Sequence, residues 1–118
     1  MEQKIEITNE DVQKRIAKGK QYCVFFYKAG PNRNLPEAEE KQLQMEHLRY
    51  LTQLQVEGKL VINGPILDDP ALKGLGIFNI ADKEEVKRLL DGDPKVKFGW
   101  LIYEVYSYFT IPGSCLPE

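Results

Sequence analysis

Two segments of this sequence, residues 20–28 and 97–109, carry apolar side chains in both of the directions that an extended strand presents. In the first segment, the two alternating sets are Tyr22, Val24 and Phe26 against Cys23, Phe25 and Tyr27. In the second, from Trp100 to Phe109, only Glu104 and Ser107 interrupt the apolar pattern. A sheet that is covered on one side should instead alternate apolar and polar residues. These two strands therefore need cover on both faces.

Cap and turn residues divide the chain of 118 residues into short elements. We predict helices at residues 8–18, 36–57 and 82–91, and strands at 20–28, 59–66, 74–80 and 97–109. Thr8 and Asp11 suit the first helix start, and Asp82 and Glu85 form a D-x-x-E capping box at the last helix. After the N-terminal helix, the order β-α-β-β-α-β predicts a ferredoxin-like α+β fold with an antiparallel sheet. We predict one domain over residues 1–118, with a helical extension at 1–19, a core at 20–109 and a tail at 110–118.

The two main helices of such a fold lie on one face of the sheet and leave the other face uncovered. A large exposed apolar patch is unusual on a soluble monomer. The simplest cover is the same face of a second copy, related by a two-fold axis, which predicts a homodimer of the dimeric α+β barrel type. The alternative is that the N-terminal helix and the C-terminal tail cover this face.

Charge and composition favour an ordinary globular domain. The formal net charge is -2, from 16 basic and 18 acidic residues, which gives no support to nucleic acid or an anionic membrane as a partner. No apolar stretch approaches the roughly 20 residues of a membrane helix, and the polar start MEQKIEITNEDV does not resemble a signal peptide. We therefore expect a cytoplasmic protein whose cysteines, Cys23 and Cys115, are thiols. Neither cysteine has metal-ligand spacing to a second ligand, so we expect no metal site.

The only histidine, His47, lies on the long predicted helix at helical spacing with Leu43, Tyr50, Leu51 and Leu54. This places the imidazole in the apolar stripe that faces the sheet. A buried imidazole needs hydrogen-bond partners, because an unsatisfied polar group costs about 1–3 kcal/mol. One interpretation is a core histidine bonded to a backbone carbonyl or to Tyr50.

Asp93 supports a second interpretation. It follows Gly92 at the end of the last predicted helix, where its carboxylate would meet the negative end of the helix dipole. Lys95 and Lys97 could offset this charge at the surface, and His47 would offset it more strongly if the fold brings them together. Such a contact would orient the ring and favour its charged form, as in a general base. Alternatively, Asp93-Pro94 only forms a turn.

The remaining candidate residues lie in loops and on strands. The pairs Gly30-Pro31 and Gly64-Pro65 either shape turns or let backbone approach a ligand. The run from Gly74 to Gly76 lacks the rest of a dinucleotide-binding motif. We predict that Gly64, Pro65, Tyr27, Tyr50 and Pro94 bind substrate, and Tyr22, Trp100 and Tyr103 are further aromatic candidates.

Three motifs make the sequence resemble the YCII-related family. They are H-L-x-x-L from His47, G-x-L-x-x-x-G-P ending at Pro65, and D-P-x-V-x-x-G from Asp93. With the first strand, the resemblance covers most of residues 20–109. It implies a dimeric α+β barrel with a ferredoxin-like fold. It also implies that His47 and Asp93 are a catalytic pair, although most members have no established activity.

The resemblance and the pair together favour an enzyme that performs elimination or isomerisation on a small aromatic or lactone-like molecule. A dehydrochlorinase relative and the muconolactone isomerases of the wider fold set this expectation. Such proton transfers need no metal or organic cofactor. The alternative is a non-catalytic dimeric module that binds a metabolite or a protein, in which the pair is structural. A third possibility is a dimer that responds to pH through its buried histidine.

Overall fold

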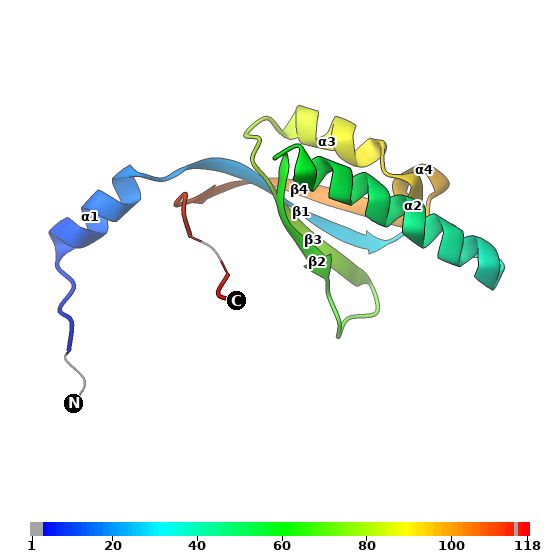
Figure 1. Ribbon diagram of the computed structural model, residues 1–118, viewed down its shortest axis with the longest axis horizontal. Helices are drawn as coiled ribbons and strands as arrows, with labels where there is room; N and C mark the ends of the chain where they lie inside the picture. Colours follow the sequence, from blue (N-terminus) through cyan, green and yellow to red (C-terminus); the bar gives the residue numbers. More distant parts are fainter. Residues whose placement is uncertain (1–3, 115) are drawn as a thin grey trace.

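The computed structural model describes residues 4–114 and 116–118, and its core is a four-stranded antiparallel sheet with helices on one face (Figure 1). The elements in chain order are α1 (Asn9–Ala17), β1 (Lys20–Ala29), α2 (Glu37–Val56), β2 (Leu60–Pro65), β3 (Leu72–Phe78), α3 (Lys83–Asp91), α4 (Pro94–Phe98) and β4 (Leu101–Thr110). The strand order is β2-β3-β1-β4. This confirms the predicted ferredoxin-like α+β fold.

The sheet register separates two faces. Cys23, Phe25 and Tyr27 of β1 are buried beneath the helices, with Phe25 fully enclosed. Partners in register on β3 face the same way, so Gly76 lies beside Phe25 and Gly74 beside Tyr27. A Cβ atom at Gly76 would overlap the Phe25 ring. The two glycines therefore leave room on β3 for the aromatic rings of β1.

The opposite face of the sheet, which we call the open face, is apolar and largely uncovered. Ile102, Tyr106 and Tyr108 of β4 are 48%, 48% and 41% exposed. The one ion pair across this face joins Lys28 Nζ to Glu104 Oε1 at 2.7 Å, among the residues that the structure describes. The sequence pattern predicted this second apolar face correctly.

Within residues 4–114 and 116–118, neither terminal segment buries the open face. Helix α1 begins with the expected capping box, in which Thr8 Oγ1 accepts from the Asp11 N–H at 3.1 Å and the Asp11 carboxylate accepts from the Thr8 N–H at 3.0 Å. It contains no buried residue and lies at the far end of the long β1–β4 pair (Figure 1). Residues 111–114 of the tail border only one end of the open face, near Tyr22 and Ile77.

Three details of the predicted elements were wrong. The last strand begins at Leu101 and not at residue 97, because Asp93 caps a short helix, Pro94 opens it and Gly99 ends it with a φ of 90°. The third strand spans residues 72–78 and not 74–80. The predicted capping box at α3 is incomplete: Asp82 accepts from the Glu84 N–H, whereas the Glu85 side chain bonds Arg88.

Two further observations concern the expected cytoplasmic location of the protein and the expected thiol state of its cysteines. Cys23 is a buried free thiol, whose Sγ donates to the Ala81 carbonyl at 3.5 Å, and Cys115 lies outside the described residues. Within residues 4–114 and 116–118, no helix combines the length and the apolar character needed to cross a bilayer.

Candidate active site

His47 lies on the side of α2 that packs against the sheet. The buried residues of this helix are Leu43, His47, Leu51 and Leu54, at intervals of three and four. This spacing puts them on one stripe, so packing of the leucines also turns the imidazole inward. The His47 side chain is 10% exposed.

Asp93 is completely buried and accepts hydrogen bonds from three donors. His47 Nδ1 lies 2.9 Å from Oδ1 and 2.7 Å from Oδ2. The Tyr27 hydroxyl donates to Oδ2 at 2.6 Å, and the backbone N–H of Lys95 donates to Oδ1 at 3.0 Å. Both carboxylate oxygens are therefore bonded, which offsets the cost of burying the charge.

The start of α4 explains why the carboxylate lies there. The sequence order puts Asp93 at the unfavourable negative end of the preceding helix. In the structure Asp93 also caps α4, so its charge meets an unpaired N–H at the start of a new helix. The carboxylate thus gains a hydrogen bond from a backbone N–H in place of the expected repulsion from the helix dipole. The side chains of His47 and Tyr27 donate two further hydrogen bonds to it.

The contact with Asp93 leaves the second ring nitrogen of His47 free. A carboxylate beside Nδ1 accepts the Nδ1 proton, so the neutral ring carries its lone pair on Nε2. None of the described residues bonds Nε2, and no buried side-chain nitrogen or oxygen among them lacks a partner, so Nε2 is accessible. His47 lines a pocket, which the exposed part of the ring faces.

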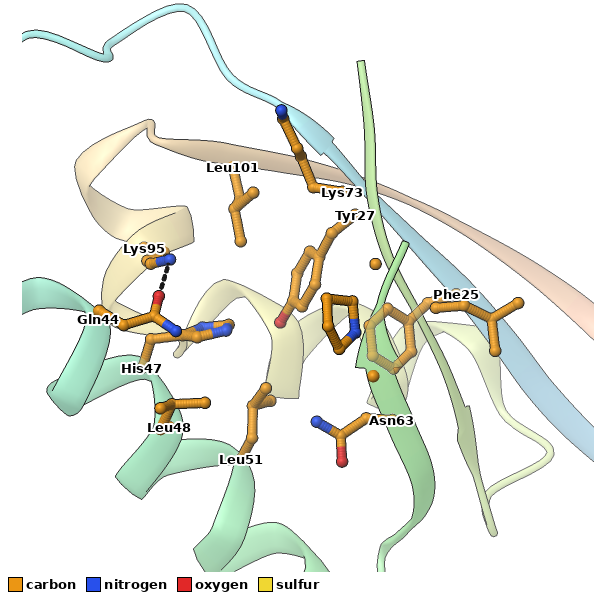
Figure 2. A pocket seen from close by; sticks show the side chains of 14 residues that line it. Phe25, Tyr27, Gln44, His47, Leu48, Leu51, Asn63, Lys73, Lys95 and Leu101 are labelled. Carbon is orange, nitrogen blue, oxygen red and sulfur yellow. Dashed lines mark hydrogen bonds between the residues drawn. The ribbon is translucent and has the colours of Figure 1, made fainter. Parts of the chain in front are cut away.

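This pocket lies between α2 and the sheet and has a volume of about 220 Å³ (Figure 2). His47 and Leu51 close it on the side of α2, while Phe25, Tyr27 and Asn63 lie opposite. The complete lining is Phe25, Tyr27, Gln44, His47, Leu48, Leu51, Asn63, Gly64, Pro65, Lys73, Gly74, Leu75, Lys95 and Leu101. A small, partly apolar ligand suits a cavity with these walls.

Tyr27 connects the pocket to the buried carboxylate. Its ring packs edge-on against His47, with centroids 5.7 Å apart. Burial raises the pKa of the Tyr27 hydroxyl far above its usual value, and the negative charge of Asp93 raises it further. The hydroxyl therefore stays protonated and acts only as a donor to Asp93.

Three of the five predicted substrate-binding residues, Tyr27, Gly64 and Pro65, line the pocket together with His47. The other two do not. The Tyr50 hydroxyl donates to the Leu89 carbonyl at 2.8 Å and packs against Gly92. Pro94 is the first residue of α4 and does not reach the cavity.

The further aromatic candidates also lie away from the pocket lining. The Tyr103 hydroxyl donates to Asp91 Oδ1 at 2.7 Å. The Arg33 guanidinium packs over the Trp100 ring, with Cζ 4.5 Å from the ring centroid. Tyr22 is on the opposite side of β1 from the buried residues of that strand.

Four polar residues of the lining were not predicted from the sequence: Gln44, Asn63, Lys73 and Lys95. Gln44 precedes His47 by three positions, so helical spacing alone could have placed it on the same side of α2. Lys95 follows Asp93 by two positions inside the unpredicted helix α4. Among residues 4–114 and 116–118, no three histidine, cysteine, aspartate or glutamate side chains are grouped as metal ligands would be.

Comparison with known proteins identifies the family. The model of the YCII-related domain family matches residues 21–110. This chain belongs to the YCII-related family. A search of curated protein sequences found no match.

Two solved structures share the fold of this YCII-related protein. One is the 5-chloro-2-hydroxyhydroquinone dehydrochlorinase of Burkholderia phenoliruptrix AC1100, in complex with 2,5-dihydroxybenzoquinone; it is 21% identical, with a TM-score of 0.51, over 70% of this chain and 90% of that one. The other is muconolactone isomerase, which is 20% identical, with a TM-score of 0.57, over 80% of this chain and 97% of that one. At this level of identity, the similarity establishes the fold alone.

Proposed function

We propose that this YCII-related protein is a cofactor-independent enzyme that uses His47 and Asp93 for acid–base elimination or isomerisation. The observation that carries the proposal is the His47–Asp93 contact at 2.7 Å, which leaves Nε2 available beside a pocket. A general base needs an oriented, accessible nitrogen within reach of a substrate proton. Asp93 orients the ring through Nδ1 and stabilises the imidazolium that forms.

In the proposed reaction, Nε2 removes a proton from a carbon next to a carbonyl group, and the C–H electrons move toward the carbonyl oxygen. In an isomerisation, the imidazolium returns this proton to a different carbon of the same molecule. Elimination from a chlorinated hydroquinone starts instead at a hydroxyl group, whose proton Nε2 removes. A second hydroxyl proton is lost, one proton is added to the carbon that bears chlorine, and chloride departs with the C–Cl bonding pair, so the products are a quinone and HCl. Proton transfers of this kind balance without an oxidant, a reductant or a metal.

The two structural neighbours suggest the substrate class. One acts on a chlorinated hydroxyhydroquinone and the other is named for a lactone, so we propose a small aromatic or lactone-like substrate. Phe25, Leu51 and Leu101 would pack against its apolar part, and Gly64 and Pro65 would contact it at the edge of the sheet.

The test uses proton exchange and chloride release. Muconolactone and 5-chloro-2-hydroxyhydroquinone are incubated with the protein in D₂O, and deuterium incorporation and free chloride are followed by NMR and an ion electrode. His47→Gln should lower the observed rate by about 10²–10⁴-fold, the usual contribution of a positioned base. Arg49→Gln, an exposed change on the same helix, is the control and should keep the rate. A His47→Gln protein with the full rate would show that His47 is not the base.

A structural role for the pair is the competing hypothesis, and one observation favours it. Asp93 caps α4 as well as bonding His47, so it would be needed for folding even without chemistry. In that case the protein is a dimeric module that binds a metabolite or a protein. His47→Gln would then lower the free energy of unfolding while ligand affinity and all exchange rates stayed unchanged.

We also propose that the protein is a cytoplasmic homodimer joined through the open face. Ile102, Tyr106 and Tyr108 give this face an exposed apolar surface that a second copy would cover. Analytical ultracentrifugation should show a dimer at micromolar concentration, and Ile102→Asp should convert it to a monomer. Val56→Asp, which changes an exposed residue at the end of α2, should leave the dimer intact. A monomeric wild-type protein would end this proposal.

A further inference from the structure

The pocket combines several positive charges with no acidic lining residue. Lys95 and Lys73 line it, and none of its lining residues is an aspartate or a glutamate. Asp93 lies behind His47, where its oxygens are already bonded by three donors. Whether His47 is neutral or protonated, the four groups Lys73, Lys95, His47 and Asp93 together carry a net positive charge.

Of the two lysines that line the pocket, Lys95 lies on the side of His47 (Figure 2). It is half-buried on α4, and its Nζ donates to Oε1 of Gln44, a neutral acceptor three positions before His47 on α2 (Figure 2). Among the described residues, no carboxylate lies within ion-pair distance of Lys95 Nζ. Gln44 therefore satisfies one of its protons without balancing its charge.

The charges around Lys95 are consistent with an unbalanced cation. Burial is the largest influence and lowers the pKa of its ammonium group, and nearby Arg33 acts in the same direction. Asp93 and Glu40 act in the opposite direction and do not cancel the effect of burial. A half-buried ammonium without a direct ion-pair partner is partly desolvated, and a bound anion would offset that cost.

Lys73 lies on the other side of the same cavity. It extends from β3, and Figure 2 shows its ammonium turned away from His47. This position suits attraction of an approaching anion more than direct contact with a ligand beside the base. Lys95 is accordingly the residue expected to contact the ligand.

We propose that the pocket binds a small carboxylate, whose negative group contacts Lys95 Nζ and the side-chain amide of Gln44 while its apolar part lies against Leu51 and Leu101. The inference rests on the proposed function insofar as it names the ligand class of the same site. A carboxylate held by Lys95 would place the adjoining carbons of the ligand next to His47, where a proton transfer would occur.

Equilibrium binding of benzoate and of its neutral isostere benzamide tests the ligand class without any turnover. The full-length protein should bind benzoate at least tenfold more tightly than benzamide, and added salt should weaken only the benzoate complex. Backbone amide shifts at Gln44 and Lys95 should report the complex in NMR titrations. Equal affinity for the two compounds, or no binding of benzoate at millimolar concentration, would overturn the proposal.

Substitutions of two lysines on α4 test whether the positive charge that binds the carboxylate belongs to Lys95. Lys95→Gln should weaken benzoate binding about tenfold, the loss of one charge-assisted hydrogen bond, while Lys95→Arg should largely restore it. Lys97→Gln removes the same charge from an exposed position of the same helix and should have little effect. The side chain of Lys95 is not part of the Asp93 contact, which uses its backbone N–H, so Lys95→Gln should fold. Equal effects of the two glutamine variants would refute a specific role of Lys95.

The two proposals can fail separately. If benzoate binds through Lys95 but His47→Gln leaves proton exchange unchanged, the carboxylate site stands and the acid–base role of His47 fails. If proton exchange depends on His47 but benzoate and benzamide bind equally, the enzyme stands and its ligand is not a carboxylate.

Discussion

Replacing Tyr27 with phenylalanine removes one hydroxyl and keeps the ring, so it isolates the bond between Tyr27 and Asp93. That bond measures 2.6 Å and ends on a carboxylate with no exposure to solvent. Hydrogen bonds to charged groups contribute about 1.5–3 kcal/mol to stability. The phenylalanine ring can keep the edge contacts to Phe25 and His47, at centroid distances of 4.9 and 5.7 Å.

The structure favours the lower part of this range. After the change, Oδ2 of Asp93 would still accept from His47 Nδ1, and Oδ1 would still accept from the Lys95 N–H. No oxygen would be left without a donor, so we expect Tyr27→Phe to lower the free energy of unfolding by about 1.5–2 kcal/mol.

Urea unfolding at pH 7 measures this loss, at one fixed protein concentration because the stability of the proposed dimer would depend on concentration. The transition midpoint should fall while the slope of free energy against urea stays constant. Tyr22→Phe is the control. Because Tyr22 lies on the open face, the two variants are compared in the monomeric Ile102→Asp background, where Tyr22→Phe should change stability by less than about 0.5 kcal/mol. A loss for Tyr27→Phe that is no larger than this control would refute the argument that the hydroxyl stabilises the buried carboxylate.

Two other predictions concern the packing and the pH dependence of the same region. Gly76→Ala should lower the free energy of unfolding by about 1–3 kcal/mol, because its Cβ would overlap the Phe25 ring, whereas Gly64→Ala meets nothing within 4 Å and should have little effect in the same urea experiment. The raised pKa of Tyr27 means that the folded state holds this proton more tightly than the unfolded chain does. The stabilisation that the protonated Tyr27 hydroxyl provides is therefore complete below about pH 10 and is lost as the pH rises above that value. Stability measured from about pH 9 to pH 11 should fall less steeply in Tyr27→Phe than in the wild-type protein; equal slopes would contradict an origin of this pH dependence in the Tyr27 hydroxyl.

Much of the fold could be predicted from the sequence because its determinants are local and periodic. Alternating apolar sets identified β1 and β4, and the spacing of Leu43, His47, Leu51 and Leu54 identified the buried side of α2. Residues 97–100 were assigned to a strand by their apolar and aromatic content. In the structure the cap at Asp93 and the left-handed Gly99 form a short helix instead, since such signals outweigh weak strand propensity.

The site was only partly predictable. The contact of His47 with Asp93 followed from helix position and from the family resemblance. The bond from Tyr27 to Asp93 joins residues 66 positions apart, and no local pattern links a strand residue to a cap of a helix that was itself not predicted. Lys95 was missed for the same reason, because its place in the pocket depends on α4.

The absence of side chains at Gly74 and Gly76 allows the rings of Tyr27 and Phe25 to settle close to the backbone of β3. The size of the pocket thus depends in part on Phe25, Gly74 and Gly76, which make no hydrogen bond to His47 or Asp93. A shorter residue in place of Phe25 would enlarge the space available to a bound compound, whereas His47 and Asp93 would keep their positions through α2 and α4. The pocket could therefore come to accept a larger compound without any change in His47 and Asp93, the groups proposed to move protons.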